Sequence, residues 1–121
     1  MHRVLSRSLK VLIFTLAAVQ SLAALQISSA LTGKWEGETT NGVPLALDLV
    51  ATATEVTGTL TRRGRTVRIT DGKVSRNTFT FKAVINEQTE AFSGQYAGDE
   101  MKVWPDRQGP QRAATLKRVK T

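Results

Sequence analysis

Two glutamates near the start of the chain have a spacing that acid–base catalysis could use. Glu36 and Glu38 are two residues apart, and in a β-strand such side chains point the same way, about 7 Å apart. Some glycoside hydrolases use carboxylate pairs at a comparable separation. Trp35 and Gly37 alternate with the glutamates, and Trp35 is expected to face a core. We therefore predict that both glutamates lie on a solvated outer face, and that the protein is not an enzyme.

Histidine and cysteine, the usual residues of metal and nucleophile chemistry, are almost missing. The chain has no cysteine, and its single histidine is His2. A thiolate or imidazole metal centre therefore has no ligands in the main part of the chain. Asp99-Glu100 is the one adjacent acidic pair, and it favours a turn more than a calcium site. We expect neither a metal nor a cofactor.

The first 30 residues have the three parts of a secretory signal peptide. A basic start (residues 3–10) precedes an apolar run (residues 11–19), and Ser28-Ser29-Ala30 places small residues where a signal peptidase cuts. We predict cleavage after Ala30, with a cut after Ala23 or Ala24 as the alternative. The mature domain would then be residues 31–121 of a secreted or periplasmic protein.

An uncleaved membrane anchor is the competing interpretation of this leader. Gln20, Ser21 and Gln26 interrupt the apolar stretch, which falls short of the roughly 18 apolar residues that a spanning helix needs. Cleavage therefore predicts a product without stable membrane insertion.

Removal of the leader changes the charge of the protein. The chain has 17 basic and 10 acidic residues, and the leader carries three of the basic ones. Fourteen cations then face ten carboxylates, a net charge of +4. Such a mildly basic protein is not expected to bind nucleic acid through its overall charge. Without disulfides, its stability must come from packing and from a hydrogen-bonded ladder.

Short segments of alternating polarity predict eight strands after the leader. Turn residues such as Asn41-Gly42 separate them. Because every connection is short, neighbouring strands must pair antiparallel. An eight-stranded meander loses its exposed edges by closing, so we predict a single small, all-β, up-and-down barrel, with an open two-layer sandwich as the alternative. The predicted strands are Lys34–Thr40, Pro44–Ala53, Val56–Arg62, Arg65–Ile69 with an extension towards Val74, Thr78–Asn86, Thr89–Tyr96, Glu100–Trp104 and Arg112–Val119.

A five-residue pattern repeats along these strands: an apolar residue, Ser or Thr, Gly, any residue, then an apolar residue. Repeated glycine inside strands suggests sharp coiling of a sheet that closes. The three instances are Leu31-Thr32-Gly33-Lys34-Trp35, Val56-Thr57-Gly58-Thr59-Leu60 and Phe92-Ser93-Gly94-Gln95-Tyr96. They resemble the first, third and sixth strands of the avidin family, and Met101-Lys102-Val103-Trp104 resembles its tryptophan-bearing seventh strand.

The chain is more closely similar to small exported bacterial domains with a lipocalin-like meander. Their pattern runs Gly-x-Trp-x-Gly, then Ile-x-Asp-Gly-Lys, then a Phe-rich strand. This chain matches it at residues 33–37, 69–73 and 78–81. The resemblance implies the barrel fold, and such domains mostly lack an assigned activity. Biotin binding does not follow from the avidin resemblance, because the biotin-contacting positions of that family hold Gly37, Leu60 and Arg62 here.

Three aromatic residues are the candidates for contact with a ligand. Trp35 and Tyr96 fall on the inward phase of their strands, and Trp104 precedes Pro105 at a predicted rim. Trp104 also matches a ligand-stacking position that the avidin resemblance implies. We predict a non-catalytic barrel that binds a small apolar or amphipathic ligand. The competing interpretation is that the aromatic residues simply fill the interior.

A basic hairpin is the sharpest surface feature of the sequence. Arg62, Arg63, Arg65 and Arg68 crowd one predicted turn, and guanidinium groups bind carboxylates and phosphates well. The alternative function is therefore docking of an anionic glycan, lipid or envelope surface. No aromatic residue is interleaved with the arginines, which argues against single-stranded nucleic acid. A charged hairpin that only keeps the protein soluble is the competing interpretation, and the oligomeric state stays open.

Overall fold

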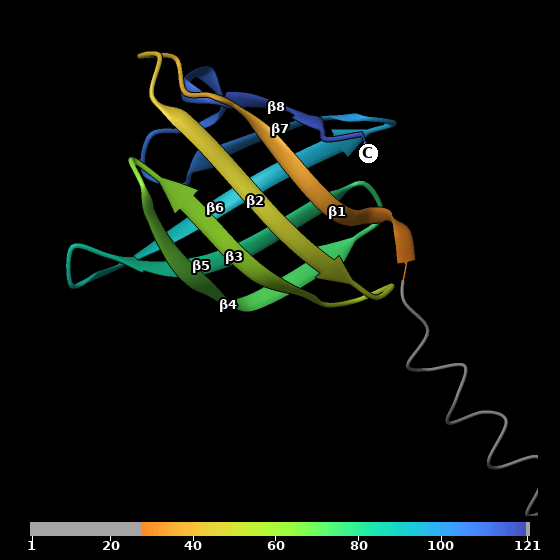
Figure 1. Cartoon of the computed structure of the whole chain (residues 1–121). Helices are drawn as coiled ribbons and strands as arrows, with labels where there is room; N and C mark the ends of the chain where they lie inside the picture. The colour runs from red at the N-terminus through yellow and green to blue at the C-terminus, as the bar shows by residue number, and fades with distance from the viewer. Residues whose placement is uncertain (1–27, 121) are drawn as a thin grey trace, which may run out of the picture.

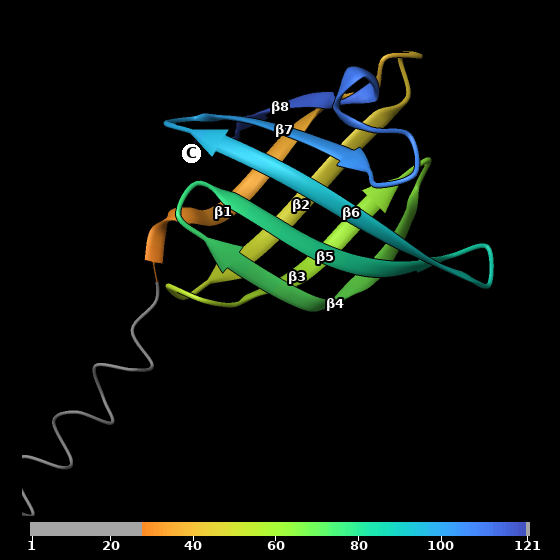
Figure 2. The same cartoon turned by 180° about the vertical axis from the view of Figure 1, so that it is seen from behind.

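The chain folds into a closed, all-antiparallel barrel of eight strands in meander order (Figures 1 and 2). The computed structural model describes residues 28–120, so most of the predicted signal peptide lies outside the described residues. The predicted fold is confirmed, and the alternative of an open sandwich is wrong because β8 pairs with β1. The strands are β1 Ser28–Glu38, β2 Pro44–Ala51, β3 Val56–Arg62, β4 Arg65–Ser75, β5 Thr78–Ile85, β6 Gln88–Ala97, β7 Glu100–Pro105 and β8 Ala114–Arg118.

The two ends of the barrel are built from different connections. The links β1–β2, β3–β4, β5–β6 and β7–β8 lie together at one end, which we call the open end (Figure 1). The links β2–β3, β4–β5 and β6–β7 lie at the other, beside the start of β1 and the end of β8 (Figure 2). We call this second end the Arg118 end, after the last residue of β8.

Alternating polarity along each strand produces the core. On β5, Phe79, Phe81 and Ala83 are buried while the residues between them are exposed, as expected for a strand with one face towards the interior. Burial of each large apolar side chain contributes about 1.5–3 kcal/mol, which offsets the entropy lost on ordering the strands. Within the described residues, every buried core residue is apolar.

An aromatic cluster runs through the interior from one end to the other. The rings of Phe79 and Phe81 stack with centroids 6.1 Å apart, and those of Phe81 and Phe92 with centroids 5.0 Å apart. Tyr96 continues the cluster towards the Arg118 end, with its ring centroid 6.3 Å from that of Phe79. The predicted inward phase of these aromatic residues, and of the fully buried Trp35, is confirmed.

Some element boundaries differ from the sequence prediction, and the predicted extension of β4 towards Val74 is confirmed. β1 begins at Ser28, which pairs with Ala51, so a cut after Ala30 would remove three residues of β1, whereas a cut after Ala24 would leave β1 whole. β4 does continue past Asp71, through an irregularity in its pairing with β5. The prediction that the last strand begins at Arg112 is wrong. Pro110 starts a 3₁₀ helix, η1 (Pro110–Arg112), because its fixed φ suits the first turn of a helix.

A glycine on β6 makes room for one of the core rings. Gly94 is buried opposite Phe79 in the β5–β6 pairing, and a methyl group on Gly94 would overlap the Phe79 ring. The ring thus covers a strand position that has no side chain of its own. This close approach explains the third instance of the repeated glycine pattern, whereas Gly33 and Gly58 have φ values of +139° and +145°, which side-chain-bearing residues rarely adopt.

We expect Gly94→Ala to lower the free energy of unfolding by about 2–3 kcal/mol, because the added methyl group overpacks the core. Urea unfolding measures the change. The control is Phe79→Leu combined with Gly94→Ala: the smaller side chain relieves the overlap, so the two effects should be less than additive. Full additivity would show that the Phe79 ring is not the reason for the glycine.

Candidate functional site

A cavity of about 740 Å³ opens at the open end of the barrel. This volume lies within the range of roughly 300–1,000 Å³ typical of small-molecule sites. Segments from most of the barrel wall line it, including the β1–β2 turn, the end of β3, the β5–β6 turn and the β7–β8 connection. The cavity therefore exists only because the sheet closes and gathers these four connections at one end.

The floor of the cavity is formed by the apolar core side chains nearest the open end. Leu45 on β2, Leu60 on β3, Phe92 on β6 and Val103 on β7 all line it, and all are buried. Ala114 on β8 completes the floor with a small side chain, which leaves space above it. The part of a molecule that entered the cavity most deeply would contact apolar side chains.

The rim of the cavity is polar and carries more positive than negative charge. Its charged members are four arginines and two carboxylates, a net charge of +2, and Thr39, Asn41 and Asn86 add uncharged polar groups. Both carboxylates have partners: Glu90 forms an ion pair with Arg107, and Asp106 accepts a hydrogen bond from the Ser93 hydroxyl. The four arginines of the rim are Arg62, Arg63, Arg107 and Arg112.

The four arginines of the predicted anion-binding hairpin do not share one surface. Arg62 and Arg63 line the cavity, but Arg65 and Arg68 do not. Arg65 reaches the neighbouring turn, where its Nη1 donates to Asn86 Oδ1 at 3.4 Å. Arg68 is exposed and precedes the buried Ile69, so it lies on the outer wall. Alternation along β4 therefore places Arg68 on the opposite face of the sheet from Arg65, which lies directly opposite Arg62 in the β3–β4 pairing.

None of the three predicted ligand-contacting aromatic residues lines this cavity. Trp35 is fully buried, and Trp104 lies half-buried on the outward phase of β7, next to the inward Val103. Tyr96 is near the opposite end, where its hydroxyl donates to the Arg76 carbonyl at 2.9 Å and its ring borders a shallower hollow. The structure gathers no two of these three aromatic residues around the cavity.

The sequence analysis missed two cavity arginines, Arg107 and Arg112. Both lie in the connection between β7 and β8, the longest link of the barrel, where the chain has no strand periodicity to indicate a direction. The signal available was the unusual length of this connection beside short turns, since long connections often carry binding residues. No short sequence pattern in this connection indicates that it lines the same cavity as the end of β3.

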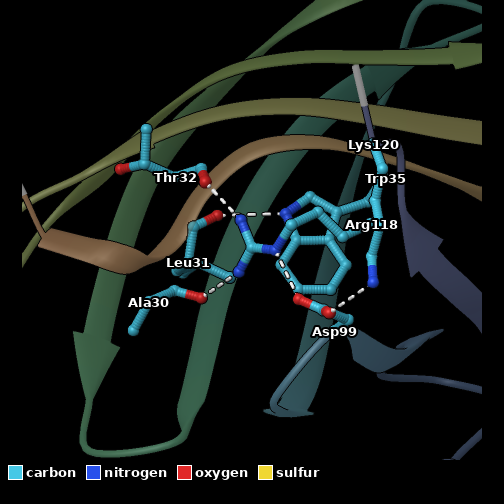
Figure 3. A network of polar contacts seen from close by, with 7 residues as sticks. All are labelled: Ala30, Leu31, Thr32, Trp35, Asp99, Arg118 and Lys120. Atoms are coloured by element: carbon cyan, nitrogen blue, oxygen red, sulfur yellow. Dashed lines mark hydrogen bonds and ion pairs between the residues drawn. The ribbon is translucent and has the colours of Figure 1, made fainter.

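The Arg118 end is closed by a network of polar contacts around Trp35 (Figure 3). The Arg118 guanidinium carbon lies 4.3 Å from the centroid of the Trp35 ring. Its Nη1 and Nη2 donate to the carbonyls of Thr32 and Ala30, each at 2.6 Å, and its Nε donates to Asp99 Oδ1 at 3.0 Å. Arg118 therefore bonds to β1 and to the β6–β7 turn while it covers the ring by a cation–π contact.

Trp35 has its own fixed position in this network. Its Nε1 donates to the Leu31 carbonyl at 3.0 Å, which satisfies the one polar atom of a fully buried side chain (Figure 3). Trp35 also pairs with Arg118 in the β1–β8 ladder. These contacts give Trp35 a packing role at the Arg118 end.

Two basic side chains at the Arg118 end act on the carboxyl group of Asp99. Hydrogen bonds from Arg118 and Lys120, together with the positive charge of Lys120, lower its pKa from the ordinary value of 3.8. The Lys120 Nζ lies 3.3 Å from Asp99 Oδ2 (Figure 3). The ionised form of Asp99 therefore stabilises the folded state.

The remaining candidates for chemistry lie on the outside of the barrel. Glu36 and Glu38 are exposed and point away from the interior, as predicted, and Glu36 pairs with Lys34 at 3.7 Å. In the part of the chain from residue 28 to residue 120, no cluster of acidic side chains could hold a metal ion. The same part contains no helix that is both long and apolar enough to cross a membrane.

Comparison with known proteins adds no family to this picture. No protein-family model, no curated protein and no solved structure matches the chain. The cavity and its residues are therefore the basis on which a function can be argued.

We expect Arg118→Gln to lower the free energy of unfolding by about 2 kcal/mol, because it removes charged hydrogen bonds to two β1 carbonyls. Chemical denaturation measures the loss. Lys117→Gln, an equal change of charge at the exposed neighbouring residue, is the control and should change stability by less than about 0.5 kcal/mol. Equal effects of the two substitutions would contradict the role given to Arg118.

We also expect Asp99→Asn to reduce the acid sensitivity of the barrel. A carboxyl with a lowered folded-state pKa stabilises the protein above its unfolded pKa, and this stabilisation is lost as the pH falls through the folded value. The wild type should therefore lose more stability than Asp99→Asn as the pH falls below about 4. Thermal unfolding across that range tests this, with Asp48→Asn on the outer wall of β2 as the control. Parallel pH profiles for wild type and Asp99→Asn would contradict it.

Proposed function

We propose that this protein is a binding barrel that takes up a small amphipathic ligand in its open-end cavity. The observation that carries the proposal is the cavity of about 740 Å³ with an apolar floor and a polar rim. Small-molecule pockets combine apolar side chains with convergent polar groups. This cavity contains both, and most of its lining residues are polar.

The asymmetry between the two barrel ends supports this proposal. At the Arg118 end, the polar groups of Arg118 and Asp99 already have partners within the protein, and Arg118 covers the Trp35 ring. At the open end the floor side chains border a cavity. The floor is packed against the aromatic cluster of the core, because the floor residue Phe92 stacks on Phe81.

In this proposal the protein works in the manner of a lipocalin-like carrier, with the ligand held at one mouth of the barrel. Eight strands enclose an interior just wide enough to be filled by side chains or to hold one small ligand. Here side chains fill the part near Trp35 and leave the part above Ala114 free. We further propose that the chain acts outside the cytoplasm, which rests on the leader in its sequence.

The cavity should bind N-phenyl-1-naphthylamine, a neutral apolar dye whose fluorescence rises in apolar surroundings. We expect Ala114→Phe to weaken dye binding at least about fivefold, because the ring occupies the space above the floor and removes apolar contact area. Fluorescence titration measures the dissociation constants.

Thr115→Phe is the matched control, because it adds a similar ring at the next position of β8, on the outer face. This variant should bind the dye like the wild type. Ile85→Trp, at the half-buried rim position of β5, narrows the same cavity and serves as a second test if Ala114→Phe is poorly folded. Unchanged dye binding in folded forms of both cavity variants would show that the cavity is not the site.

A further inference from the structure

We propose that the cavity selects an anionic amphiphile, a single apolar chain with a carboxylate head, and that Arg62, Arg63 and Arg112 bind the head. This inference rests on the proposed function and adds the chemistry of the ligand's head group. The tail would lie on the apolar floor, and the carboxylate would lie among the guanidinium groups of the rim.

The three arginines come from two distant parts of the chain. Arg62 ends β3, Arg63 follows it in the β3–β4 turn, and Arg112 ends η1 between β7 and β8. All three line the cavity, and none forms an ion pair with a carboxylate of the described residues. Guanidinium groups bind carboxylates through paired, charge-assisted hydrogen bonds. The rim thus presents three such donors with no anionic partner from the chain.

The acidic groups of the rim do not neutralise these three arginines. Glu90 is mostly buried, with 16% of its side chain exposed, and it is engaged by Arg107. Asp106 accepts a hydrogen bond from the Ser93 hydroxyl. Of the four rim arginines, only Arg107 therefore has a carboxylate partner among the described residues.

The head-group site and the floor are continuous along β3. Leu60 is buried in the floor, and Arg62 is the next residue on the inward phase of the same strand. Arg62 also lies opposite Leu45, another floor residue, in the β2–β3 pairing. One inward step along the strand therefore leads from apolar floor to charged rim, which matches the step from tail to head in an amphiphile.

Arg68 provides an internal control for this inference. It lies on the same hairpin as Arg62 and carries the same charge, but it is exposed on the outer wall of β4, opposite Thr59. Loss of Arg68 changes the total charge of the protein as much as loss of Arg62. Of these two arginines, Arg62 lines the cavity and Arg68 does not.

The test compares three probes with ten-carbon chains by isothermal titration calorimetry at low salt. Decanoate and decyltrimethylammonium are used below their micelle concentrations, and decanol is used below its solubility limit. We expect the wild type to bind decanoate about tenfold more tightly than decanol, and the ammonium probe most weakly. The Arg62→Gln/Arg112→Gln variant should lose about tenfold in decanoate affinity and stay within about twofold for decanol. Arg68→Gln should leave all three affinities unchanged, and added salt should reduce the decanoate preference.

A second variant predicts a change of opposite sign. Glu90→Gln removes the carboxylate that engages Arg107 and raises the net charge of the rim. We expect its decanoate affinity to rise about threefold over that of the wild type, while its decanol affinity stays unchanged. Thermal unfolding of every variant confirms that the compared proteins are folded.

The outcomes separate the two proposals. Equal affinity for decanoate and decanol, unaffected by Arg62→Gln/Arg112→Gln, would overturn the head-group inference and leave the cavity function standing. An equal loss of decanoate affinity in Arg68→Gln would also overturn it, because overall charge would then explain the preference. Failure of all three probes and of the neutral dye to bind would overturn the proposed function itself.

Discussion

The structure depends on the closure of β1 against β8. Four residue pairs join the two strands, and Trp35 and Arg118 form one of them. Arg118 strengthens the closure because its guanidinium bonds to β1 carbonyls as well as to Asp99. Without this seam both strands would be open edges with unpaired backbone groups, and the interior would lack a wall. The buried core and the cavity follow from it.

The same type of side chain behaves differently at the two ends of the barrel, and its partners decide how. The Arg118 guanidinium contacts the Trp35 ring, two backbone carbonyls and the Asp99 carboxylate, so all of its partners lie within the protein. Arg62 and Arg112 border a cavity and form no ion pair with a carboxylate of the described residues. One end is therefore stabilised by its arginine, while at the other end Arg62, Arg63 and Arg112 have no ion-pair partner among the described residues.

The interior shows how packing and space coexist in a small barrel. The rings of Phe79, Phe81 and Phe92 fill the space between the walls, and Gly94 has no side chain so that the Phe79 ring can lie across it. Ala114, Leu45 and Leu60 line the cavity at the open end. The cavity is the region of the barrel that the inward side chains leave unfilled. Its polar rim comes from the turns and connections that surround it.

Much of the fold could be predicted because its determinants are local. The inward positions of β2 and β5 follow from alternation with period two, and short turns allow only antiparallel neighbours. The path near Arg112 could not be predicted in the same way. η1 interrupts the expected strand at a proline, and the length of that connection does not specify its direction.

The candidate site was only half accessible to sequence reasoning. The basic character of the β3–β4 hairpin is visible in the sequence, but Arg62 and Arg68 fall on opposite faces of the sheet, and their separation matters only once the barrel has an inside. Trp104 resembled a ligand-stacking residue, yet the pairing of β7 directs the neighbouring Val103 inward instead.

The sequence by itself determined the strand count, the meander order and the inward faces, since these depend on residues within one strand or one turn. The tertiary structure alone decided which arginines meet at the open end and that Arg118 covers Trp35. Those meetings join residues far apart in the chain, and they exist only after β8 returns to β1 and the sheet becomes a barrel.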